Sequence, residues 1–81
     1  MARKAYLGVD VGSVSTNLVL LNEQGEVLEK LYLRTRGEPI AVIQEGMKML
    51  APAASGLQIA GVGTTGSGRR LAAVILGADC V

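Results

Sequence analysis

The sequence predicts an α/β domain in which three strands, a helix, a fourth strand and a second helix follow one another. Three observations lead to this prediction: short apolar runs of β-forming residues, two segments with apolar residues at three- and four-residue spacing, and turn formers between them. Hydrophobic residues make up 49% of the chain and charged residues 19%, the balance of a folded protein with a core. With 81 residues, we expect one domain or part of one.

The expected strands are residues 5–11, 15–21, 26–34 and 57–63. A Gly-Ser turn separates the first two strands, which we expect to pair, and residues 22–25 supply the next turn. In the third strand Glu29 interrupts the apolar face. A charge at such a position favours an edge strand, which must discourage pairing with other chains.

The first expected helix begins at Pro39, because proline pre-sets the first helical turn, and ends at Pro52. Its apolar face consists of Ile40, Ile43, Met47 and Leu50. The second expected helix follows a glycine-rich loop and ends near Gly77. Its expected apolar face consists of Leu71, Val74, Ile75 and Ala78.

The charges predict neither a nucleic-acid partner nor a membrane partner. Eight basic and seven acidic side chains are spread along the sequence and give a net charge of +1, so no broad cationic field forms. Tyr6 and Tyr32 are the only aromatic residues, too few for a base-stacking platform. No apolar run approaches the roughly 20 residues of a transmembrane helix, and no signal peptide opens the chain, so we expect a cytoplasmic protein. Cys80 is the only cysteine and is expected to act as a small apolar residue.

The first candidate site is the segment GVDVGSVST, residues 8–16, in which Asp10 stands at a strand end just before a turn. Gly12 lets the backbone turn sharply and approach a ligand closely. A carboxylate in this place suits phosphate-bound magnesium, directly or through water. Asp10 is therefore the candidate catalytic and metal residue. The segment holds no covalent nucleophile, so its work would be the orientation and charge stabilisation of an in-line attack by water.

The expected phosphate-binding residues are Gly12, Ser13, Val14, Ser15 and Thr16. Backbone amides from Gly12 to Val14 would donate to phosphate oxygens, and the serine hydroxyls would add further donors. An ordinary hairpin, whose Asp and Ser residues cap the turn, explains the same residues locally.

The second candidate site is the segment GVGTTGSGRR, residues 61–70, where a strand leads into a helix. It contains G-x-G-x-x-G from Gly61, but a dinucleotide fingerprint also needs an acidic residue about 20 positions further on and follows the first strand of its fold. A P-loop would need Lys where Arg69 stands and Ser or Thr where Arg70 stands. A flexible loop before a helix N-terminus remains the simplest alternative, and its free amides would still suit an anion.

The two arginines of this segment lie in the first turn of the expected helix, where the helix dipole disfavours cations. Their placement favours an acidic or anionic contact, although a solvated arginine pair is the common case. Because residues 12–15 already serve phosphate, we expect the second loop to act in coupling or partner contact. The residues of this contact loop are Thr65, Gly66, Ser67, Gly68 and Arg69.

The pattern G-x-D-x-G-S followed by a hydroxyl-rich strand is similar to the first phosphate motif of the actin, Hsp70 and sugar-kinase ATPases. In that superfamily a β-β-β-α-β-α unit opens the fold, which is the order expected here. The resemblance implies a ribonuclease-H-like half-domain of the actin-like ATPase fold, incomplete at this length. Residues 1–81 would then be the N-terminal part of a single ATPase domain that binds ATP and magnesium.

Three segments, GVDVGSVSTNLVLL, TRGEPI and GVGTTGSGRRLA, together resemble the BadF/BadG/BcrA/BcrD ATPase family, nearest to the activators of 2-hydroxyacyl-CoA dehydratases. The resemblance implies a homodimeric ATPase with an iron-sulfur cluster between its subunits, which drives a low-potential electron into a dehydratase or reductase that acts on an acyl-CoA. The cluster cysteines and the rest of the ATP site lie beyond Val81 in that family, so the segment alone is expected to be inactive. Asn17 stands where several members carry lysine.

Two other functions remain open from the sequence. One is a sugar or carboxylate kinase of the same superfamily, which would transfer a phosphoryl group to a substrate. The other is a non-catalytic module that binds peptidoglycan or protein. The isolated segment is also expected to self-associate along the edge of the strand at residues 57–63, because an unpaired apolar edge is a template for pairing.

Overall fold

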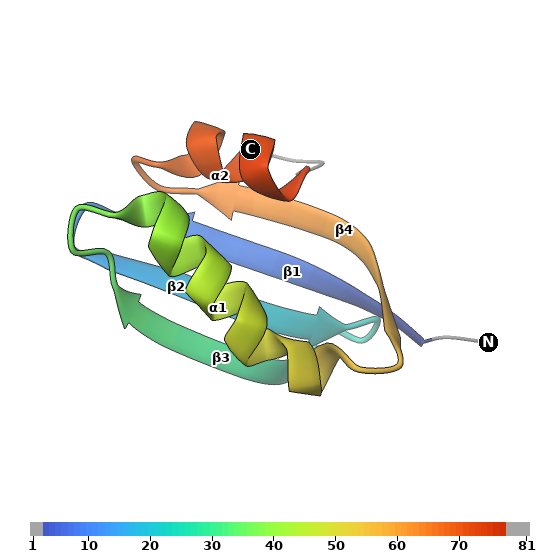
Figure 1. The fold of residues 1–81 in the computed structure, drawn as a ribbon. Helices are drawn as coiled ribbons and strands as arrows, with labels where there is room; N and C mark the ends of the chain where they lie inside the picture. Colours follow the sequence, from blue (N-terminus) through green and yellow to red (C-terminus); the bar gives the residue numbers. More distant parts are fainter. Residues whose placement is uncertain (1–2, 78–81) are drawn as a thin grey trace.

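The computed structural model describes residues 3–77 and has the predicted order of elements (Figure 1). These elements are β1 (Arg3–Val11), β2 (Ser15–Asn22), β3 (Val27–Arg34), α1 (Pro39–Ala54), β4 (Leu57–Thr65) and α2 (Arg69–Leu76). The strands form one sheet in the order β3-β2-β1-β4, and both helices pack on the same face of it (Figure 1). Cys80 lies outside the described residues. In the described part of the chain, neither helix has the length and apolar character that a bilayer span requires.

The sheet is mixed, and its register determines what lies beside Asp10. β1 pairs antiparallel with β2, so Asp10 lies opposite Asn17, and parallel with β4, so Asp10 also lies opposite Thr65. The carboxyl ends of β1 and β4 therefore meet at one end of the sheet, next to the turn between β1 and β2. β3 lies at an edge of the sheet, as the charge of Glu29 predicted.

The core lies between the sheet and the two helices. Alternate residues of β1 and β2 point into it, as expected for strands with one buried face. Its most buried members are Ala5, Leu7, Val9, Val11, Leu18, Leu20, Val42, Ile43, Leu50 and Ala72. A Cβ on Gly46 would lie 2.9 Å from both methyl carbons of Leu18, so α1 crosses β2 without a side chain between them. Each large buried side chain contributes about 1.5–3 kcal/mol, and together they fix the β1–β2 hairpin under the helices.

Three boundaries lie two residues beyond their expected positions, at the start of β1 (Arg3) and at the ends of α1 and β4. α1 continues past Pro52 to Ala54, because a proline in the last turn forfeits only one hydrogen bond and the helix then closes with Ser55 N–H donating to the Pro52 oxygen. β4 reaches Thr65 because its parallel pairing with β1 continues to the Asp10 position.

The predicted apolar face of α2 was wrong. Val74 is 82% exposed and Leu71 40% exposed, whereas Ala72 is fully buried and Leu76 packs against the core. The cause is at the start of the helix, where Gly68 N–H donates to the Val11 oxygen at 2.9 Å. This contact fixes the rotation of α2 so that Ala72, one turn after Gly68, faces the sheet. The Ile75 side chain and Ala78 lie outside what the structure describes.

Candidate functional site

The β1–β2 turn presents its tip to solvent beside Asp10. Gly12 N–H donates to the Ser15 oxygen at 2.9 Å, and a Cβ on Gly12 would lie 2.9 Å from that same oxygen, so the hairpin closes only with glycine here. Ser13 and Val14 form the exposed tip, and Ser15 is half-buried. Asp10 is exposed at the carboxyl end of β1. The structure thus brings the predicted phosphate residues and the predicted metal residue to one end of the sheet.

Some backbone N–H groups of this turn are already hydrogen-bonded within the protein, and others are free. The Gly12 amide, expected to serve phosphate, is already engaged with Ser15. Within residues 3–77 the amides of Ser13 and Val14 form no hydrogen bond. Two adjacent free N–H groups at an exposed turn are the elements of an anion-binding concavity. The free donors are therefore fewer than expected and are concentrated at the tip.

Thr16 lies apart from the other predicted phosphate residues. Its side chain is fully buried, and its hydroxyl lies 2.9 Å from the hydroxyl of Thr35. Side chains of β2 alternate between a buried and a more exposed face, and Thr16 is on the buried face. Its hydroxyl therefore faces the core and lies behind the turn. Thr35 had no predicted role: in the sequence it is the first residue of the segment TRGEPI, between a strand and the start of a helix.

The second candidate loop packs directly on the first site. Gly66 has φ +91°, and a side chain there would collide with the carbonyl oxygen of Val11 and with the Asp10 carboxylate. That oxygen also accepts hydrogen bonds from Gly68 N–H at 2.9 Å and from the Ser67 hydroxyl at 3.4 Å. Glycine at position 66 is therefore required both by backbone conformation and by this close approach. The two motifs, which are far apart in sequence, form one surface at the end of β1.

The remaining residues of the contact loop hold it in place. The buried Thr64 hydroxyl donates to the Arg69 oxygen at 2.9 Å, which ties the end of β4 to the start of α2. The Arg69 guanidinium donates to the Gly66 oxygen at 3.1 Å and is itself exposed. Thr65 is exposed beside Asp10, and Arg70 is exposed on α2. Arg69 thus braces its own loop and still presents its charge to solvent.

A hollow of about 380 Å³ adjoins Asp10 on the sheet. It is lined by Gly8, Val9, Asp10, Asn17, Leu18, Val19, Lys30, Gly63, Thr64 and Thr65. Most of its side chains alternate with the buried ones and so face away from the helices. Gly8 and Gly63 add no side chains to it, and the Val19 side chain covers Gly8. Asp10 and Lys30 bring opposite charges to this hollow. Asn17, which also lines it, is uncharged, so Lys30 is the cation among the lining residues.

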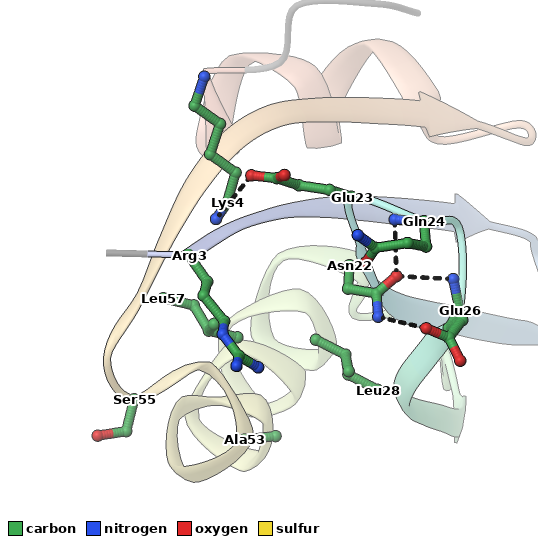
Figure 2. A pocket seen from close by; sticks show the side chains of 10 residues that line it. All are labelled: Arg3, Lys4, Asn22, Glu23, Gln24, Glu26, Leu28, Ala53, Ser55 and Leu57. Atoms are coloured by element: carbon green, nitrogen blue, oxygen red, sulfur yellow. Dashed lines mark hydrogen bonds between the residues drawn. The ribbon is translucent and has the colours of Figure 1, made fainter. Parts of the chain in front are cut away.

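A larger hollow, of about 730 Å³, lies at the opposite end of the sheet and is unrelated to this surface (Figure 2). Its hairpin turn is capped by Asn22, whose Oδ1 accepts from the amides of Gln24 and Glu26 at 3.0 and 2.9 Å. Figure 2 shows Arg3 extending toward the last turn of α1. No basic residue of α1 itself lies in the last turn of that helix.

Asp10 could hold magnesium only with help from a ligand. Among residues 3–77 no three His, Cys, Asp or Glu side chains gather into a group that could hold a metal ion. Magnesium prefers about six oxygen ligands and is commonly bound through one or two carboxylates, water and phosphate. A single exposed carboxylate beside two free amides fits that mode of binding, because phosphate would supply the missing oxygens.

No protein-family model matches this chain. The chain is 45% identical over 40 residues to the glucokinase of Pyrobaculum calidifontis, and the match covers 49% of this chain and 14% of that protein. The chain therefore spans a small part of the curated relative.

Solved structures show the same fold at greater coverage. Component A of the (R)-2-hydroxyglutaryl-CoA dehydratase of Acidaminococcus fermentans matches 94% of this chain with a TM-score of 0.74 and 24% identity. A ROK family glucokinase from Streptomyces griseus, in complex with glucose and AMPPNP, and a putative 2-dehydro-3-deoxygalactonokinase from Sinorhizobium meliloti each match 78% with TM-scores of 0.57, at 21% and 22% identity. The chain spans 29%, 20% and 21% of these proteins. It has the α/β fold found in the actin-like ATPases and sugar kinases, as the sequence predicted.

Proposed function

We propose that the β1–β2 turn is the phosphate and magnesium side of an ATP site, in a protein that uses ATP as an ATPase or kinase. The observation that carries this proposal is the pair of free amides at Ser13 and Val14 beside the exposed Asp10 carboxylate. Support comes from the similar fold of a glucokinase that was solved with the ATP analogue AMPPNP. Because anions bind well where several backbone N–H groups converge, the tip suits the terminal phosphates of ATP.

Each residue of the turn has a distinct part in this proposal. The amides of Ser13 and Val14 donate to phosphate oxygens, and the hydroxyls of Ser13 and Ser15 reach the same group. Asp10 binds magnesium directly or through water, and the ion when bound neutralises charge on the phosphates. Gly12 keeps the turn tight. None of these side chains acts as a covalent nucleophile, so the turn contributes by position and charge.

The finer proposal is that the parent protein activates a CoA-ester dehydratase or reductase by ATP-driven electron transfer. The supporting observation is the match to component A of a 2-hydroxyglutaryl-CoA dehydratase, which covers 94% of this chain against 78% for the kinases. In this proposal the full-length protein is a homodimer with an iron-sulfur cluster, and the exposed Arg69 of residues 65–69 contacts the partner enzyme. The loop position supports that role, since it touches the Asp10 end of β1 and remains accessible.

A sugar or carboxylate kinase is the second candidate. It is supported by the 45% identity to a glucokinase and by the two kinase structures of similar fold. In a kinase the hollow between Asp10 and Lys30 would lie beside the transferred phosphoryl group and would contact the acceptor.

The two candidates separate in one set of assays on the full-length protein. Calorimetric titration with magnesium-ATP tests the shared proposal first, and micromolar binding is the expected result. ATP hydrolysis without a sugar, coupled to reductive activation of a 2-hydroxyacyl-CoA dehydratase, supports the activator. ADP release that requires a sugar or carboxylate acceptor supports the kinase. A full-length protein that binds no magnesium-ATP would overturn both and leave the non-catalytic binding module.

A further inference from the structure

Thr35 lies directly behind the exposed tip of the β1–β2 turn. It follows the last residue of β3 and is only 3% exposed. Its hydroxyl lies 2.8 Å from the Gly12 oxygen and 2.9 Å from the Thr16 hydroxyl, and its amide donates to the Val14 oxygen at 2.9 Å. One side chain and its own backbone therefore contact both ends of the Ser13–Val14 tip.

The direction of these hydrogen bonds follows from the groups involved. A carbonyl oxygen can only accept, so the single hydroxyl proton of Thr35 is donated to Gly12. The Thr16 hydroxyl must then donate to Thr35. The result is a buried chain from Thr16 through Thr35 to the Gly12 carbonyl. In this chain of hydrogen bonds, the hydroxyl proton of Thr16 and that of Thr35 each have an acceptor.

The bond to Gly12 fixes the orientation of the next amide. The peptide group between Gly12 and Ser13 is planar and trans, so its N–H points opposite to its C=O. Because the carbonyl points to the buried Thr35, the Ser13 N–H points away from the core. At the other end of the tip, the Thr35 amide holds the carbonyl of Val14 and so fixes the peptide group between Val14 and Ser15.

We propose that Thr35 is a positioning residue for the phosphate site. It aims the free Ser13 amide by holding the Gly12 carbonyl, and it confines the peptide group that carries the Val14 amide by also holding the next peptide group, at Val14–Ser15. The inference rests on the proposed ATP site. It adds a residue that contacts no ligand, comes 23 positions after Gly12 in sequence, and controls affinity for phosphate through the backbone.

The backbone after Thr35 also fits this role. Arg36 has φ +54° and Gly37 φ +68°, so the chain reverses within two residues before α1 begins at Pro39. A left-handed arginine is conformationally costly. This reversal allows the Thr35 side chain to point into the core behind the tip, and it allows α1 to start on that core face of the sheet.

The test compares three variants of the full-length protein by calorimetric titration with magnesium-ATP and with adenosine, which lacks phosphate. Thr35→Val keeps the shape and the amide but removes the hydroxyl, and it should weaken magnesium-ATP binding at least tenfold while adenosine binding stays within twofold. Thr35→Ser restores the hydroxyl and should bind both ligands within twofold of wild type. Thr35→Cys retains only a weak donor and should lie between them, which provides a measurement if the valine variant fails to fold.

A matched control separates positioning from loss of stability. Leu50→Ala empties a buried position at the far end of α1 and should destabilise the fold without changing the ratio of the two affinities. Two outcomes would overturn the inference and leave the ATP site in place. One is an equal loss of magnesium-ATP and adenosine binding in Thr35→Val. The other is the absence of any loss of magnesium-ATP binding in Thr35→Val or in Thr35→Cys. A wild-type protein that binds no magnesium-ATP would remove the ATP site and the role of Thr35 together.

Discussion

The two hairpin turns of this protein, at opposite ends of the sheet, handle their backbone donors in opposite ways. In the turn after β2, Asn22 saturates the amides of Gln24 and Glu26 with its own side chain (Figure 2). In the turn after β1, the amides of Ser13 and Val14 stay free, and support comes from Thr35, which is distant in sequence.

This difference separates a turn that only reverses the chain from a turn that is suited to bind a ligand. A local side chain that accepts from two amides of its own turn stabilises the turn and leaves fewer donors for a phosphate. A turn braced from behind by a buried hydroxyl and by a glycine loop keeps its shape while its outward amides remain available. If this comparison is correct, equivalent damage to the two turns should have different consequences.

The largest difference is expected between two left-handed glycines. Gly66→Ala should destabilise the full-length protein by about 3 kcal/mol, since both backbone strain and a collision with Val11 and Asp10 oppose it. Gly25→Ala in the other turn has a similar φ of +80° but nothing within 4 Å, so about 1 kcal/mol of strain is expected. Chemical denaturation measures both. Equal losses would mean that the loop at residues 66–68 does not press on β1 as the structure indicates.

Neutralising the Asp10 carboxylate, beside the β1–β2 turn, is expected to change activity by nearly as much free energy as Gly66→Ala changes stability. Asp10→Asn should lower ATP hydrolysis about 100-fold, the scale of losing one electrostatic contact in a transition state, while the free energy of unfolding without ligand shifts by less than about 1 kcal/mol. Glu23→Gln, an exposed carboxylate of the other turn, is the control and should leave the rate unchanged. An Asp10→Asn protein with the wild-type rate would contradict the magnesium role.

The reverse pattern is expected in the turn after β2, which Asn22 caps with its own side chain. Asn22→Ala removes two accepted hydrogen bonds and one donated to Glu26, and should cost about 1–2 kcal/mol of stability with no change in magnesium-ATP affinity. Asn22→Asp keeps the accepting oxygen for both amides but places a second carboxylate against Glu26, so it should recover only part of this loss. Denaturant melts combined with nucleotide titration give both quantities. Weaker ATP binding in Asn22→Ala would show that the two ends of the sheet are coupled.

The same contrast explains what could be predicted from the sequence. The order of elements, the turn at residues 22–25 and the place of Asp10 at a strand end depend on neighbours in sequence, and local periodicity and turn chemistry were sufficient for them. The role of Thr35 was missed because its partners are distant in sequence, and a threonine between a strand and a glycine-containing turn resembles an ordinary loop residue. The face of α2 was wrong for the same reason: its rotation is set by the contact between Gly68 and Val11.

The smallest effect on nucleotide binding is expected at Arg69, and it tests whether the contact loop has a role apart from phosphate. Its guanidinium bonds to the Gly66 oxygen at 3.1 Å, an exposed interaction that contributes little to the shape of a loop already held by Thr64 and Gly68. Arg69→Ala should therefore leave magnesium-ATP affinity within about threefold, under 1 kcal/mol. If the exposed charge contacts a partner enzyme, activation of the dehydratase should fall well beyond that factor. The neighbouring Arg70→Ala, which removes an exposed cation without a bond to the loop, is the matched control. A large loss of ATP binding in Arg69→Ala with activation per bound ATP intact would assign Arg69 to the phosphate site and make the two loops one binding surface.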